Sequence, residues 1–184
     1  MKQLKLNGLE PVKRTLVFDI ETQRGFGETR QISEMGVAAA VSYDCLAREY
    51  KVYTEENIQE LIEDIFNSDI VVGYNVIQFD YNVLKGYTNR DFKTLKTVDM
   101  MRIVEKPLGF RPKLNNLVAA TLGESKSADG LQSLIWYRQG KIDKVIEYCK
   151  QDVKVTKDLY EFGRDNGFVL ATTLQGQVRV PVEW

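Results

Sequence analysis

The sequence predicts an α/β domain, because segments typical of strands and segments typical of helices follow one another along the chain. Three extended runs come first, an amphipathic helix follows them, and a short apolar run precedes several further helical segments. This succession indicates a sheet covered by helices. A chain of 184 residues with 43% hydrophobic content can bury one sizeable core, so we expect one domain.

The first predicted strand, residues 15–21, carries two carboxylates. It mixes β-branched and aromatic residues and gives way to a glycine-rich loop. Asp19 and Glu21 lie two positions apart, and therefore on one face of this strand. Further extended runs at about 34–42 and 46–53 flank a short polar turn. Three consecutive antiparallel strands are the simplest interpretation.

From Thr54 the apolar pattern takes the period of a helix. Apolar residues recur every three to four positions from Ile58 to Phe66, behind a threonine cap and two acids, which predicts an amphipathic helix. The all-apolar run 70–72 suits a strand that is buried on both faces. A further helix is expected to begin near Asp80.

Three more helices are predicted in the second half of the chain. Apolar residues have helical spacing over 114–122 and stop at a glycine, and the next helix is expected at about 130–138. The longest helical segment covers about 143–162. On it Tyr148 and Asp152 are four positions apart, so they lie on neighbouring turns of one face.

The end of the chain is expected to form a β-hairpin at about 168–184. Its arms are 168–173 and 178–182, and Pro181 makes the second arm an edge strand. Residues 1–13 are interpreted as an N-terminal extension that precedes the domain at 14–184.

The chain contains no histidine, and this absence restricts its chemistry. Nucleophiles that rely on a histidine base, and zinc sites with histidine ligands, are excluded. The two cysteines, Cys45 and Cys149, do not form a Cys-x-x-Cys pair, so a disulfide scaffold and a thiolate zinc site are not expected. Any catalysis must therefore use carboxylates and metals.

Net charge, hydropathy and cysteine content restrict the expected partners and compartment of the protein. The net charge is −1, so a nucleic-acid contact would be local rather than a property of the whole surface. No run approaches the ~18 apolar residues of a membrane span, and no signal peptide is recognisable. The low cysteine content suits a reducing compartment, and we expect a cytoplasmic protein without a membrane partner.

Each acidic residue has a structural interpretation when it is considered alone. Asp19 and Glu21 fit a strand face in solvent, and Asp80 fits a helix N-terminus, where the dipole favours a carboxylate. Asp152 could pair with a neighbouring lysine, Lys150 or Lys154. Together these interpretations are weak, because acids from three distant segments interrupt otherwise apolar patterns.

Three segments resemble, in order and spacing, the exonuclease motifs of the DEDD superfamily. They are Phe18-Asp-Ile-Glu21, Gly73-Tyr-Asn-Val-Ile-Gln-Phe-Asp80 and Tyr148-Cys-Lys-Gln-Asp152. The likeness covers about residues 14–162 and is greatest to the proofreading exonuclease domains of family B DNA polymerases and their stand-alone relatives. The third motif is of the tyrosine type, and the alternative type needs a histidine that this chain lacks.

The resemblance implies a ribonuclease H-like fold, with a central mixed sheet flanked by helices, and a metal-dependent 3′→5′ exonuclease. Asp19, Glu21, Asp80 and Asp152 would hold two Mg²⁺ or Mn²⁺ ions, since these hard cations prefer oxygen ligands. Asp19 would bridge both ions, Glu21 and Asp152 would complete the site on the nucleophile side, and Asp80 would hold the second ion through water. Tyr148 would orient the attacking water.

The expected substrate is single-stranded nucleic acid, with DNA favoured. Phe26 and Phe79 could stack on terminal bases, although core packing also explains Phe79. Asn75 either supports the second motif or contacts the nucleotide. Residues 85–113 hold eight Lys or Arg against three acids, and this segment, which ends at Lys113, is either a basic rim that guides the phosphate backbone or a solvated face.

Two other functions stay open. A ribonuclease H-like endonuclease would share the fold and the metals but not the tyrosine spacing, and a non-catalytic nucleic-acid-binding subunit would keep the fold for docking. The sequence does not distinguish DNA from RNA, because discrimination of the 2′-hydroxyl depends on pocket shape. Nor does it separate a stand-alone protein from part of a longer one, or identify a helicase or polymerase partner.

Overall fold

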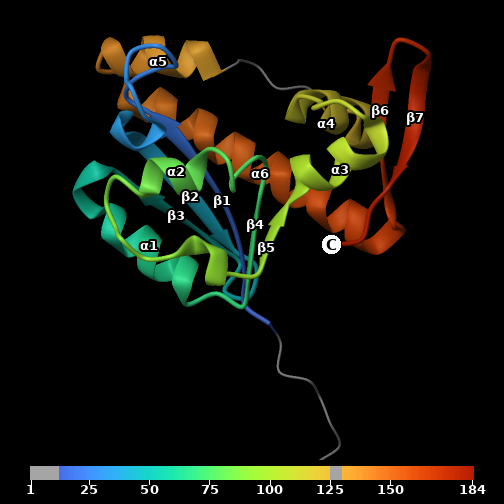
Figure 1. Ribbon diagram of the computed structural model, residues 1–184, viewed down its shortest axis with the longest axis horizontal. Helices are drawn as coiled ribbons and strands as arrows, with labels where there is room; N and C mark the ends of the chain where they lie inside the picture. Colours follow the sequence, from blue (N-terminus) through green and yellow to red (C-terminus); the bar gives the residue numbers. More distant parts are fainter. Residues whose placement is uncertain (1–12, 125–129) are drawn as a thin grey trace, which may run out of the picture.

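The computed structural model describes residues 13–124 and 130–184, which form an α/β fold built on one mixed sheet (Figure 1). The strands of this sheet have the order β3-β2-β1-β4-β5. They are β1 (Thr15–Thr22), β2 (Val37–Asp44), β3 (Glu49–Tyr53), β4 (Ile70–Gly73) and β5 (Thr97–Asp99). β2 runs antiparallel to β1 and β3, whereas β4 runs parallel to β1 and β5. The predicted mixed sheet and its three consecutive antiparallel strands are confirmed.

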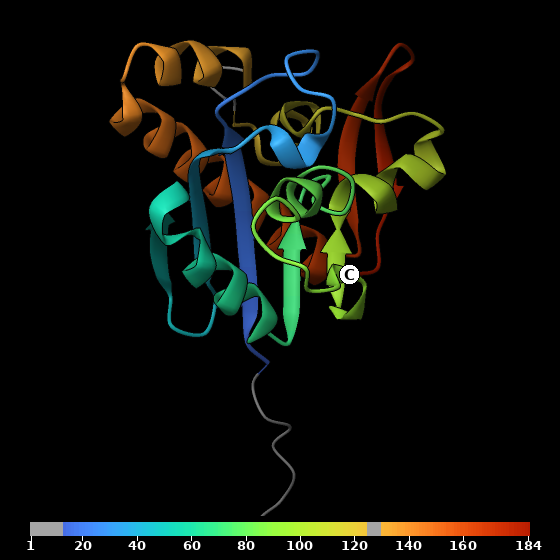
Figure 2. The same ribbon diagram turned by 60° about the vertical axis from the view of Figure 1, so that its left-hand side comes forward.

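Helices cover both faces of the sheet. They are α1 (Ile58–Phe66), α2 (Asp80–Leu84), α3 (Met100–Leu108), α4 (Leu114–Leu122), α5 (Gly130–Arg138) and α6 (Ile142–Asn166). α1 and α2 lie on one face, and α6 crosses the other (Figures 1 and 2). No helix within 13–124 or 130–184 has the length and apolar character needed to cross a membrane.

The residues of β1 alternate between two hydrophobic cores. Leu16, Phe18 and Ile20 pack on the side of α1 and α2, whereas Val17 belongs to the core beneath α6. Side chains two positions apart share a face of a strand. Asp19 and Glu21 therefore continue the face that α6 covers.

The predicted C-terminal hairpin is confirmed as β6 (Phe168–Thr173) paired with β7 (Gly176–Pro181). Side chains of α4 form hydrogen bonds with the backbone of β6 along the edge that β7 leaves free. The Asn116 amide bonds both backbone groups of Thr172, at 2.8 and 2.9 Å, and the Thr121 hydroxyl bonds both backbone groups of Leu170, at 3.1 and 2.9 Å. The hairpin is thereby fixed to the domain, beside α3 and α4 in Figure 1.

Several element boundaries differ from the predicted ones. The second predicted strand begins only at Val37, because residues 32–34 form a short 3-10 helix. The third begins at Glu49, because the Asp44 carboxylate accepts two backbone N–H groups of the preceding turn. β5 and α3 were not predicted. The N-terminal extension proposed at 1–13 lies outside the described residues except for Lys13.

Candidate active site

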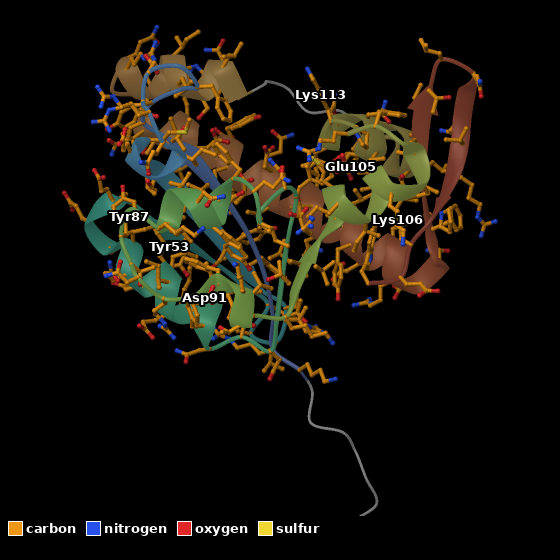
Figure 3. All side chains as sticks on the ribbon, in the orientation of Figure 1. Tyr53, Tyr87, Asp91, Glu105, Lys106 and Lys113 are labelled. Carbon is orange, nitrogen blue, oxygen red and sulfur yellow. The ribbon has the colours of Figure 1, made fainter. Side chains whose placement is uncertain are left out.

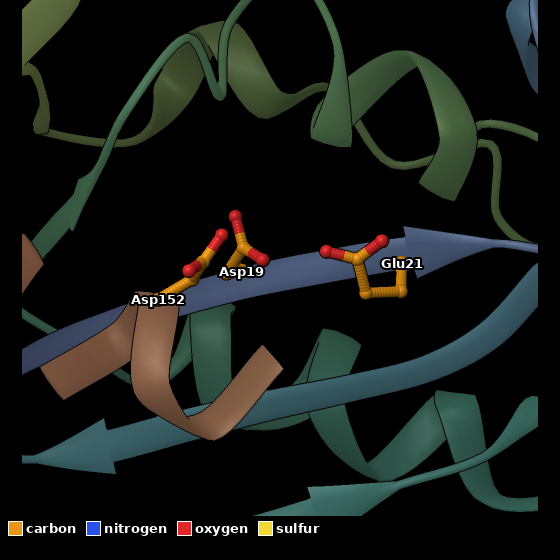
Figure 4. Close-up of side chains that lie close together, drawn as sticks. All are labelled: Asp19, Glu21 and Asp152. Carbon is orange, nitrogen blue, oxygen red and sulfur yellow. The ribbon is translucent and has the colours of Figure 1, made fainter. Parts of the chain in front are cut away.

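Two strand residues and one helix residue bring three carboxylates together. Asp19 and Glu21 lie on β1, Asp152 lies on α6, and Figure 4 shows the three side chains pointing toward one another. Each offers one ligand oxygen, and these atoms all lie within 4.8 Å of one another. Carboxylates at this spacing repel each other in the absence of a cation. With oxygen donors alone, the group fits a hard divalent ion such as Mg²⁺ or Mn²⁺.

The burial of Asp19 and Glu21 does not fit a strand face that is turned to solvent. Asp19 and Glu21 are half-buried, and Asp152 is only 6% exposed. Lys154, which was one candidate ion-pair partner of Asp152, pairs instead with Glu124 and Asp158. β1 has a register shift between Glu21 and Thr22, and such bulges redirect side chains at the end of a strand.

Asp80, the fourth predicted ligand, lies apart from this cluster. It begins α2, is 2% exposed, and accepts a hydrogen bond from the Ile20 backbone N–H at 3.1 Å. Burial, with a smaller contribution from the charge of Asp99, raises the pKa of Asp80 to about 7, and backbone hydrogen bonds oppose part of this shift. Asp80 lines the same cleft as the other three carboxylates.

The cleft that contains these acids has a volume of about 870 Å³. Its lining includes every residue predicted to be catalytic: Asp19, Glu21, Asp80, Tyr148 and Asp152. Phe26, Phe79 and Lys113 line it too, whereas Asn75 does not. Residues from β1 and its following loop, from the start of α2, from the start of α4 and from α6 therefore meet at one cleft.

Tyr148 lies one helical turn before Asp152 and is 5% exposed. Its ring contacts the edge of the Trp136 ring, with 6.2 Å between centroids. Burial raises the pKa of the Tyr148 hydroxyl far above its ordinary value, and the charges of Asp152 and the two acids on β1 raise it further. The hydroxyl therefore stays protonated at neutral pH and can donate a hydrogen bond, but it is no general base.

The glycine-rich loop after β1 brings an aromatic side chain to the cleft. Phe26 is 77% exposed and packs against Phe79, with 5.6 Å between ring centroids. Glu28 holds the loop, because it pairs with Arg138 of α5 at 2.6 Å and accepts the Gly25 backbone N–H. Phe79 also packs partly against the core beside α1, so its two predicted roles are compatible.

The loop between β4 and α2 folds tightly, and its sequence explains how. A Cβ on Gly73 would lie 2.1 Å from Val76 Cγ1, so only glycine lets Val76 pack there. Asn75 has φ 67°, in the left-handed region that asparagine tolerates better than most residues. Its buried Oδ1 has no hydrogen-bond partner within the described residues. This conformation is compatible with the predicted role of Asn75 in supporting the second motif, and its contact with a nucleotide stays a prediction.

Of the eight basic residues in segment 85–113, only Lys113 lines the cleft. Figure 3 shows Lys113 next to the start of α4 and Lys106 on the preceding helix, α3. The Tyr74 hydroxyl donates to the Pro112 carbonyl and so anchors the backbone next to Lys113. The other basic residues of the segment lie outside the cleft lining, so the basic rim stays a prediction.

Two other cations of the cleft were not identified from the sequence. Arg24 follows β1, and Arg138 lies near the end of α5. Neither lies in a segment as rich in basic residues as 85–113. The Arg138–Glu28 pair joins positions 110 residues apart, so no local pattern could have revealed it.

Comparisons with known proteins agree with this geometry. A family described as the RNase H superfamily matches residues 16–162. Among solved structures, a family B DNA polymerase from the hyperthermophilic archaeon Pyrobaculum calidifontis is similar, with a TM-score of 0.64 and 19% identity. The likeness covers 85% of this chain and 25% of the polymerase, so the chain spans about a quarter of that protein, and it concerns the fold alone. No curated protein sequence matches the chain.

Proposed function

This chain belongs to the RNase H superfamily, and from that premise we propose that it is a metal-dependent 3′→5′ exonuclease. It would hydrolyse phosphodiester bonds at the 3′ end of single-stranded nucleic acid, with DNA favoured, and release nucleoside 5′-monophosphates. One observation carries the proposal. The ligand oxygens of Asp19, Glu21 and Asp152 lie within 4.8 Å of one another, in the cleft that Tyr148 also lines.

The carboxylates would hold two Mg²⁺ or Mn²⁺ ions. Asp19, Glu21 and Asp152 would bind one ion, Asp19 would be shared with the other, and Asp80 would reach the second through water. When bound, such ions lower the pKa of the attacking water and stabilise charge on the phosphate. The described donor set fits them, because it contains carboxylate oxygens and no imidazole.

Tyr148 would orient the attacking water rather than deprotonate it. The hydroxyl is protonated because burial and three nearby carboxylates disfavour the phenolate. A neutral hydroxyl beside Asp152 can hold a water or a phosphate oxygen by a hydrogen bond. The tyrosine would therefore contribute alignment of the reacting atoms rather than proton transfer.

The walls of the cleft suit a single strand. Phe26 and Phe79 present aromatic surface on which unpaired bases can stack, and stacking is tolerant of sequence. Arg24 and Lys113 supply local positive charge for the phosphate backbone, whereas the charge of Arg138 is paired with Glu28. This combination of stacking surface and local charge supports a single-stranded substrate.

The test uses purified protein with 5′-labelled single-stranded DNA and RNA of one sequence, in Mg²⁺, in Mn²⁺ and in chelator. We expect a ladder that shortens stepwise from the 3′ end in either metal, with no cleavage in chelator. Asp19→Asn, prepared identically, excludes a contaminating nuclease if it is inactive. Circular single-stranded DNA should resist.

The same assay separates the other functions. Rapid nicking of the circle would identify an endonuclease and overturn the proposal. Binding without cleavage in every metal condition would identify a non-catalytic subunit. The ratio of DNA to RNA cleavage then decides the sugar preference.

A further inference from the structure

A carboxylate outside the cleft holds the loop that precedes Asp80 and α2. Asp99 ends β5 and lies opposite Gly73, the last residue of β4, in the strand register. It is 2% exposed and is not part of the cleft lining. An acid buried at this position needs hydrogen-bond partners, and the neighbouring loop supplies them.

Both oxygens of Asp99 bind backbone N–H groups of the β4–α2 loop. Oδ1 accepts from the Asn75 N–H at 2.9 Å, and Oδ2 accepts from the Ile77 N–H at 3.0 Å. Oδ1 also accepts from the Arg102 N–H at 3.4 Å, at the start of α3. Hydrogen bonds to a charged acceptor are roughly twice as strong as neutral ones, so the carboxylate ties the loop to the end of β5.

The tied loop determines where α2 begins. Asn75 takes a left-handed conformation that costs a non-glycine residue free energy and persists only when its surroundings enforce it. Its carbonyl accepts the N–H groups of Gln78 and Phe79, the two residues before Asp80. Asp80 then accepts the Ile20 N–H of β1 at 3.1 Å.

We propose that Asp99 is a positioning residue for the nuclease reaction. It acts through Asp80 and touches neither substrate nor metal. Its two bonds to the loop fix the Asn75 turn, and the turn places the Asp80 carboxylate at the cleft. The inference rests on the proposed exonuclease function, but the hydrogen-bond chain it describes can be measured without activity.

The test uses the full chain with Asp99→Asn or Asp99→Ser. Asparagine and serine both cap helices well, so α3 keeps its N-terminal partner. Neither side chain can accept both loop N–H groups, because the amide has one acceptor oxygen and the serine hydroxyl is shorter. Asp91→Asn is the matched control, since Asp91 caps a 3-10 helix outside the cleft through the Lys93 N–H at 3.0 Å.

In both Asp99 variants, amide hydrogen exchange at Asn75, at Ile77 or at both should accelerate about tenfold or more. The kcat on 5′-labelled single-stranded DNA should fall about 10²-fold, since small misplacements of a catalytic group have effects of this size. The Mn²⁺ affinity of the Asp19–Glu21–Asp152 cluster, followed by electron paramagnetic resonance, should stay that of the wild type. Asp91→Asn should change none of these quantities.

Unchanged exchange at the two loop amides would overturn the proposal, and so would faster exchange with an undiminished kcat. A parallel loss of Mn²⁺ affinity would show general loosening of the fold instead of positioning. If the wild-type protein cleaves nothing, the proposed function fails by itself. In that case the hydrogen exchange of the Ile20 amide tests the inference about Asp99. It must still accelerate in both Asp99 variants if Asp99 holds Asp80 against β1.

Discussion

The thiol of Cys149 donates to the backbone carbonyl of Asp19 at 3.3 Å and lies 3.6 Å from the Asp19 carboxylate. It is fully buried, and burial, together with nearby carboxylates, raises its pKa well above the ordinary value, so it remains a neutral thiol. This contact seats α6 directly on β1. The spacing between Asp152 and Asp19 therefore depends on the size of one buried side chain.

Enlarging that side chain should separate the ligands. Cys149→Met adds volume between α6 and β1, which typically costs about 1–3 kcal/mol of unfolding free energy. We expect the variant to fold but to bind Mn²⁺ more weakly, as measured by calorimetric titration. Cys149→Ser should bind nearly as wild type, and Cys45→Met, at the other free cysteine, controls for a larger side chain. Unaltered Mn²⁺ affinity in Cys149→Met would contradict this account.

Tyr148→Phe should separate positioning from metal binding. Removal of the hydroxyl leaves all four carboxylates in place, so metal affinity should be unchanged. The single-turnover rate should fall about 10²-fold, equivalent to about 2.7 kcal/mol. Asp19→Asn, in contrast, should abolish turnover. Rapid-quench measurements on single-stranded DNA test this, and an unchanged rate would remove Tyr148 from the mechanism.

Asp80 should make the stability of the metal-free protein depend on pH. Its pKa is about 7 in the folded chain, against an ordinary value of 3.8, so the folded state binds more protons between these limits. The contribution of Asp80 to stability is therefore lost as pH rises from about 4 to about 7. The loss is on the order of 4 kcal/mol at most.

The Asp80→Asn variant has no carboxyl proton to lose at this position. Its stability should therefore decline less than that of the wild type as pH rises from about 4 to about 7. Urea unfolding in chelator at pH 4.5 to 7.5 measures it, as the difference between the wild type and the variant. Asp91→Asn, a change at an exposed aspartate, should follow the wild-type curve. Parallel curves for the wild type and Asp80→Asn would show that burial does not raise the pKa of Asp80 as stated.

The sequence predicted the order of most elements because their periods are long enough to detect. α6, with 25 residues, is an example, and β1 is indicated by its mix of β-branched and aromatic residues. β5 has three residues and no period, and α3 includes Pro107, which is unusual inside a helix. Such short or irregular elements are defined by their neighbours in the sheet, and periodicity cannot reveal them.

The acidic residues of the site could be identified because they interrupt apolar patterns, whereas their supports could not. Asp99 holds the second motif through backbone N–H groups. Val76 can pack against Gly73 because glycine has no side chain. The orientation of Asp80 toward the Ile20 N–H likewise depends on β1, 60 residues away. These relationships are tertiary, so spacing along the chain does not encode them.

Metal removal should destabilise the protein, because the cluster of Asp19, Glu21 and Asp152 concentrates negative charge. A cation that binds only the folded state stabilises it by about 2.7 kcal/mol at a hundred times its dissociation constant. At roughly 2–4 °C per kcal/mol for a chain of this size, Mn²⁺ should raise the melting temperature by about 5–10 °C.

Asp19→Asn removes a repelling charge and a ligand together. We therefore expect this variant to melt at a higher temperature than the wild type in chelator, yet to gain little from Mn²⁺. Asp91→Asn should show the full wild-type shift in Mn²⁺ and no gain in chelator. Thermal melts of the three proteins with and without Mn²⁺ make the comparison. If Asp19→Asn keeps the whole metal-dependent shift, Asp19 is not a ligand, and the proposed metal site fails with it.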